Sequence, residues 1–169
     1  VKLTGSAELK LSEARFQTFE ARNILLDAQM ADSLLPKVEW QAQADRFAGP
    51  DLAMSGIQAK GSTGIVTGDV EAEAGPLARI RSFSADAGFA LLEANEVQLG
   101  PTSVRIDSKR KGKGPLTGSF ALEASDASSP WLNAAQATFS GEGHLGDDIK
   151  VADVKGDLSV SGANVPASM

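Results

Sequence analysis

The sequence predicts an all-β, mainly antiparallel protein, formed as one elongated, curved sheet or β-groove of serial hairpins. Most of the chain alternates apolar with polar residues at a period of two, as strands do when successive side chains point to opposite faces. Four Gly-Pro pairs, beginning at positions 49, 75, 100 and 114, punctuate this pattern. The apolar positions are rich in Ala and Gly, which are small for a close-packed interior. A thin β-sandwich is the alternative architecture.

The first expected strand covers residues 3–11. Its apolar face and its polar face separate cleanly, which no helix would achieve. The apolar face consists of Leu3, Gly5, Ala7, Leu9 and Leu11.

Residues 12–35 are compatible with two structures. They are rich in helix formers, and Phe16, Phe19, Leu26 and Met30 fall near a helical spacing. This spacing would suit one short helix packed across an end or a face of the sheet. In the competing strand, apolar and polar residues alternate from position 26 to position 30, and Asn23 interrupts the apolar stripe of the helix.

Beyond Pro36 the alternation predicts strands throughout. Proline cannot donate a hydrogen bond to a sheet ladder, so the Gly-Pro pairs should lie between strands or on edges. The longer expected strands cover residues 38–45, 66–74, 83–91, 116–124, 135–141 and 154–162, and shorter ones cover 52–59, 96–99 and 103–106.

Composition excludes several classes of function. The 169 residues carry a formal net charge of −6, which argues against a nucleic-acid partner because phosphate contacts need concentrated Lys and Arg. The chain has no cysteine, so disulfides, Cys-ligated zinc, iron–sulfur clusters and thiol catalysis are excluded. No stretch is long and apolar enough for a membrane-spanning helix, and no signal peptide is visible. We expect one β-rich domain over residues 1–169, and the initial Val1 favours a slice of a longer protein.

Two motifs give weak signals. Gly141, Gly143 and Gly146 spell G-x-G-x-x-G, but this fingerprint binds a dinucleotide only where a helix follows it. Alternating residues follow instead, so we expect a glycine-rich turn in which His144, the only histidine, is exposed. We expect no catalytic residue, no metal site and no cofactor.

One basic cluster stands out in an acidic chain. It could contact anionic phospholipid headgroups, and it would equally suit a solvated hairpin tip between Ile106 and Leu116. The cluster consists of Lys109, Arg110, Lys111 and Lys113.

Parts of the sequence consist of alternating strands of small residues that are separated by Gly-Pro turns and end at glycines, such as GPLTGSFALEAS and FSGEGHLGDDIKVADVKGDLSVSG. These parts resemble segments of AsmA-like bacterial envelope proteins. This pattern of residues is most similar to that of the YdbH-type members, with TamB-like proteins as relatives. The resemblance implies a periplasmic β-groove that bridges the inner and outer membranes and passes phospholipid acyl chains along without catalysis. It also implies a parent protein anchored in the inner membrane by a segment outside this chain.

The small apolar faces agree with such a groove, since a curved sheet could shelter an acyl chain from water at about 0.8 kcal/mol per buried methylene. Expected partners are phospholipid acyl chains and other envelope proteins or further segments of the same chain. The candidate groove residues are Val70, Ala72, Phe83, Phe89, Phe120, Leu122 and Phe139.

Two other classes of function compete with lipid transport. One is a structural or interaction β-module, such as an envelope adhesin or scaffold with a thin core. The other is a glycan-processing enzyme, which would need acids among Glu71, Glu73 and Asp86 to converge in a cleft.

Overall fold

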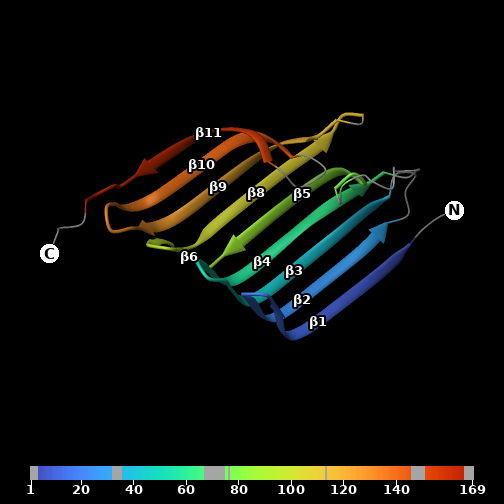
Figure 1. Cartoon of the computed structure of the whole chain (residues 1–169), viewed down its shortest axis with the longest axis horizontal. Coiled ribbons are helices and arrows are strands. Elements are labelled where there is room, and N and C mark those ends of the chain that lie inside the picture. The colour runs from blue at the N-terminus through green and yellow to red at the C-terminus, as the bar shows by residue number, and fades with distance from the viewer. Residues whose placement is uncertain are drawn as a thin grey trace.

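A computed structural model describes residues 4–31, 36–66, 75, 77–112, 114–145 and 151–165. These residues form eleven strands in one antiparallel sheet (Figure 1). The strands are β1 (Gly5–Phe16), β2 (Phe19–Ala31), β3 (Lys37–Ala48), β4 (Leu52–Ile65), β5 (Ile80–Phe89), β6 (Leu91–Ala94), β7 (Val97–Leu99), β8 (Thr102–Arg110), β9 (Leu116–Ser128), β10 (Asn133–Leu145) and β11 (Val151–Ser161). The predicted all-β class and antiparallel sheet are therefore confirmed.

The sheet is a simple meander. Its strand order is β1-β2-β3-β4-β5-β8-β9-β10-β11, so nearly every strand pairs with its neighbour in sequence. The short hairpin β6–β7 lies beside this path, pairing with β4 on one side and β9 on the other. Figure 1 shows the long strands side by side, with β1 at one edge and β11 at the other.

The Gly-Pro pairs lie between strands, as the loss of a backbone donor requires. Gly49-Pro50 joins β3 to β4, Gly100-Pro101 joins β7 to β8, and Gly114-Pro115 joins β8 to β9. Gly75 precedes β5, and Pro76 lies outside the described residues.

Of the two structures compatible with residues 12–35, the strand is correct and the short helix is wrong for the described part of that segment. Residues 12–31 complete β1, turn at Gln17 and Thr18, and form β2. The register places Leu26 opposite Leu9 and Ile24 opposite Leu11. This apolar pairing between strands outweighs the intrinsic helix propensity of the segment.

The described sheet is a single layer. Only five of its residues are buried, and the largest of them, Leu116, is 3% exposed. The others are Gly64, Thr102, Ala124 and Ala134. No second sheet packs on either face within the described ranges, so this part of the chain is not the alternative β-sandwich.

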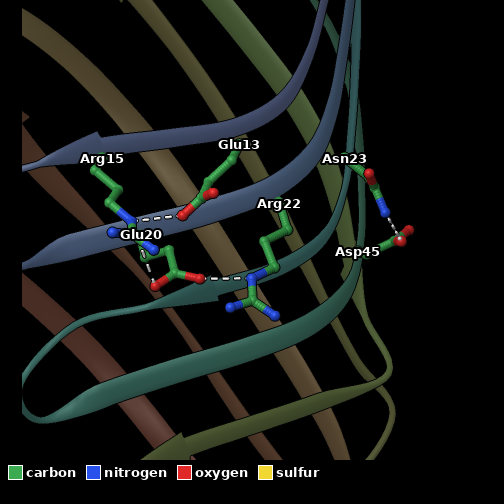
Figure 2. A network of polar contacts seen from close by, with 6 residues as sticks. All are labelled: Glu13, Arg15, Glu20, Arg22, Asn23 and Asp45. Atoms are coloured by element: carbon green, nitrogen blue, oxygen red, sulfur yellow. Dashed lines mark hydrogen bonds and ion pairs between the residues drawn. The ribbon is translucent and has the colours of Figure 1, made fainter.

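A crease crosses the strands where four residues have positive φ. Asn23 in β2, Gly56 in β4 and Asp126 in β9 have φ of 50°, 59° and 52°, and Gly162 follows β11 with φ 61°. Asn, Asp and Gly tolerate this left-handed conformation better than other residues. Asn23 Nδ2 donates to Asp45 Oδ2 of β3 at 2.6 Å, and Figure 2 shows both side chains on the outside of a bend in their ribbons.

The apolar pattern shifts by one residue at the crease. In β2 the apolar residues have even sequence numbers from Ile24 onward, but odd numbers before the crease, at Phe19 and Ala21. In β3 they change from even to odd numbers between Ala44 and Phe47. Polar side chains beyond the crease follow the shifted pattern and form ion pairs, shown in Figure 2: Arg15 with Glu13 at 2.5 Å and with Glu20 at 3.9 Å, and Arg22 with Glu20 at 2.5 Å. The shift thus keeps apolar residues on the inner side of the bend and polar residues on the outer side.

Candidate functional site: an apolar groove

One face of the sheet is apolar from edge to edge. Because the strands pair without large offsets, apolar positions align in rows that cross all nine strands of the main path. One row consists of Leu9, Leu26, Ala42, Ala59, Ala87, Val104, Leu122, Phe139 and Leu158. The neighbouring row consists of Ala7, Ala28, Trp40, Gly61, Ala85, Ile106, Phe120, Gly141 and Gly156.

Aromatic rings lie over glycines of the adjacent strand. A Cβ at Gly61 would be 2.6 Å from Trp40 Cζ2, and a Cβ at Gly141 would be 2.9 Å from Phe120 Cζ. Glycine is found in strands where another group approaches the backbone closely. These glycines, which are too small to fill a core, therefore leave room for aromatic rings that lie flat along the sheet.

The rings also contact one another. Trp40 stacks on Phe83 with centroids 5.9 Å apart, and Phe120 lies tilted against Phe139 at 5.1 Å. The indole nitrogen of Trp40 donates to Thr63 Oγ1 at 3.2 Å, which satisfies its only polar atom. These pairs fix the aromatic surface of the groove in place.

A hollow of about 420 Å³ lies on this face at the end of the strands that carries Leu116 and Leu145. Its walls are almost wholly apolar and come from β5, β8, β9, β10 and β11, together with Leu77 of the turn before β5. Drug-sized apolar sites in proteins have comparable volumes. The main lining side chains are Leu77, Ile80, Phe83, Ile106, Leu116, Phe120, Leu145 and Val154.

Arg110 secures one wall of the hollow. Its Nε donates to the carbonyl of Ile80 at 2.9 Å, its Nη2 to that of Leu77 at 3.0 Å and its Nη1 to that of Gly114 at 2.6 Å. A planar guanidinium suits such a three-way contact because its donors form a fixed fork. The half-buried Arg110 therefore ties the turn before β5 to the turn between β8 and β9.

The predicted groove residues lie on the same face where they are described. Phe83 and Phe120 line the hollow, and Leu122 and Phe139 face each other across β9 and β10 in the central row. Phe89 is half-buried opposite the buried Thr102. Val70 and Ala72 lie outside the described residues.

The predicted basic cluster is divided by the strand pleat. Lys109 and Lys111 are exposed, whereas the guanidinium of Arg110 contacts backbone carbonyls. Lys113 lies outside the described residues. Headgroup contact by Lys109 and Lys111 stays a prediction, and Arg110 has the structural role described above.

Several groove residues were missing from the predicted set. Trp40, Ile106, Leu145 and Val154 belong to apolar positions of their strands, but only the register shows that they join one surface. The expected glycine turn is wrong at Gly141 and Gly143, which lie inside β10, and Gly146 lies outside the described residues. His144 is exposed as predicted, within the strand and at the margin of the hollow.

The opposite face is polar and charged. Arg105 Nε donates to Asp86 Oδ1 at 2.7 Å, and this hydrogen bond, with the charge of the carboxylate, raises the pKa of Arg105. Asp86 is thus engaged in an exposed ion pair, while Glu71 and Glu73 lie outside the described residues. Across the described ranges, no group of three or more His, Asp or Glu side chains could hold a metal ion, and no helix could cross a membrane.

Compared with known proteins, the chain matches no family model, no curated protein and no solved structure.

Proposed function

We propose that this chain is a segment of a periplasmic β-groove that binds phospholipid acyl chains and passes them between the inner and outer membranes, in the manner of AsmA-like proteins. The observation that supports this proposal is the uncovered apolar face with its apolar hollow. Contiguous exposed apolar surface marks a site for another apolar group.

Exposure along the rows gives the proposal its energetic basis. Leu158 is 70% exposed, Leu9 is 47% exposed and Ile106 is 37% exposed, although all three belong to the apolar face. An acyl chain lying on these side chains would remove both partners from water. Each methylene buried in this way contributes about 0.8 kcal/mol, so a chain of ordinary length would bind without any polar contact.

The rows also suit movement of a lipid tail. They cross the strands without a charged side chain, so neighbouring positions offer similar apolar contacts. A tail could advance along such a surface in small steps, because no strong polar contact would hold it at one position. No step of this transport makes or breaks a covalent bond.

The direct test is lipid extraction and native mass spectrometry of protein purified from a bacterial envelope. We expect copurified phospholipid, and binding of a photoreactive fatty acid to the purified chain with adducts on the apolar face. Absence of both would exclude lipid binding.

Matched variants assign the binding to one face. Phe120→Asp should strongly reduce crosslinking, whereas Ser140→Asp, an exposed position on the polar face of β10, should retain it. Leu158→Asp and Ser159→Asp form a second pair at sites so exposed that neither substitution should disturb folding. Equal crosslinking by both members of each pair would contradict the proposal.

The same apolar face would also suit the second candidate, a structural module that packs on another protein. Light scattering separates the two functions. Association that persists after delipidation and is lost in Leu158→Asp would favour the module.

A further inference from the structure

The turn between β9 and β10 presents a tryptophan to solvent. Trp131 is 68% exposed, far more than Trp40 on the groove face, which is half-buried. Leu132 beside it is 39% exposed. A large aromatic side chain held out of the fold in this way contributes little to stability, so its exposure calls for another use.

The turn is held by hydrogen bonds rather than loosely extended. Ser129 N donates to the carbonyl of Leu132 at 2.9 Å, and the Ser129 hydroxyl oxygen accepts from the backbone nitrogens of Trp131 at 3.3 Å and Leu132 at 3.0 Å. Pro130 further restricts the backbone. The indole is therefore presented from a preorganised turn.

A second strand end adds to this surface. Asn133 and Asn164 form an isolated antiparallel bridge, with both backbone hydrogen bonds at 2.9 Å. The bridge places Val165, which is 78% exposed, beside Leu132. We call Trp131, Leu132 and Val165 the apolar tip.

The apolar tip is small, and the sequence around its tryptophan carries no charged residue. Residues 127–141 contain no Asp, Glu, Lys or Arg. A stable protein interface needs about 800 Å² from each partner, which three side chains cannot supply. A bilayer makes no such demand, because single Trp side chains are enriched at membrane–water interfaces, where the ring lies among the headgroups.

We propose that the apolar tip anchors this end of the sheet in the interface of a phospholipid bilayer, without requiring anionic lipid. The tip lies at one end of β9, and the basic turn, with Lys109 near the end of β8 and Lys111 just after it, lies at the other end (Figure 1). At about 3.3 Å per residue, the 13 residues of β9 separate the two by roughly 43 Å. The tip and the basic turn can therefore be tested separately.

The test measures tryptophan fluorescence and vesicle flotation. In a Trp40→Phe background Trp131 is the only tryptophan, so its emission reports the tip alone. With vesicles of pure phosphatidylcholine we expect a blue shift, quenching by brominated acyl chains, and little change between low and high salt. The double variant Trp131→Ser, Leu132→Ser should partition roughly tenfold more weakly or worse, as expected from the loss of two apolar side chains.

Val66→Ser is the matched control, because Val66 is 37% exposed and follows β4 at the end of the sheet opposite the tip, outside the hollow. It should float like the parent chain. The anchor is overturned if Trp131 emission does not shift with phosphatidylcholine, or if flotation requires anionic lipid and is lost on replacing Lys109 and Lys111. It is also overturned if the shift appears without vesicles as protein concentration rises, which would indicate a protein contact. Copurified lipid should be unaffected by the tip variant, so failure of the anchor and failure of the groove give different results.

Discussion

The ring of Trp40 covers its cross-strand neighbour Gly61, so closely that a Cβ at position 61 would lie 2.6 Å from Cζ2 of the indole. The same arrangement recurs where Phe120 covers its cross-strand neighbour Gly141, and Phe139 covers Gly156 on the diagonal. Rings seated on glycines allow a single sheet to bury part of its aromatic surface without a second layer.

Gly61→Ala should therefore lower the free energy of unfolding by about 1–3 kcal/mol, the usual cost of overpacking. The new Cβ would lie even closer to the carbonyl oxygen of Ser84 than to the indole, so the backbone of β5 as well as the indole would have to shift. Urea denaturation measures the change. Gly88→Ala is the control, because its nearest neighbour would be 3.9 Å away, and it should be neutral or slightly stabilising. Equal losses in the two variants would contradict the seating of Trp40 on Gly61.

Arg110→Met should lower the free energy of unfolding by roughly 2–3 kcal/mol, since hydrogen bonds to a charged group are lost and the Leu77 and Ile80 carbonyls lose a donor. Arg110→Lys should recover only part of the loss, because an ammonium cannot reproduce the fork of the guanidinium. Hydrogen exchange should show the largest increase at residues 77–80. Lys109→Met, at the exposed adjacent position, should change stability by no more than about 0.5 kcal/mol. A Lys109 effect as large as that of Arg110 would show that charge alone is responsible.

The crease predicts an unusual order of substitutions at position 23. Asn23→Gly keeps access to positive φ and loses only the hydrogen bond to Asp45, so we expect a cost of about 1 kcal/mol. Asn23→Val loses the same bond and adds the steric penalty of a left-handed L-residue, roughly 1–2 kcal/mol more. Thermal unfolding compares the two. If valine, a strong strand former, were tolerated as well as glycine, the positive φ at Asn23 would be wrong.

Alternation predicted most of this fold because it is a local property. The strands containing Val38 to Ala44 and Leu116 to Ala124 could be assigned from their own residues. Residues 12–31 could not, since the choice between helix and strand depends on Leu26 facing Leu9, a contact across the sheet. The crease was missed for a related reason: the shift of apolar phase beside Asn23 resembles a failure of the strand pattern until the positive φ is known.

The groove was predicted in part. Phe83, Phe120, Leu122 and Phe139 lie on the apolar face because each belongs to the apolar set of its strand. Trp40 belongs to such a set too, but its place beside Phe83 follows from the alignment of β3, β4 and β5. The role of Arg110 depends on carbonyls about 30 residues away in sequence, which no local pattern indicates.

The meander order makes the capacity of this surface additive. Nine strands about 4.8 Å apart span roughly 38 Å, and each further hairpin would extend the surface by about 10 Å. Because the described strands form a single layer, removing or duplicating a hairpin would change the length of the apolar path without opening a cavity in a core. The length of the apolar surface is thus set by the number of hairpins that the gene encodes, and evolution can change it one hairpin at a time.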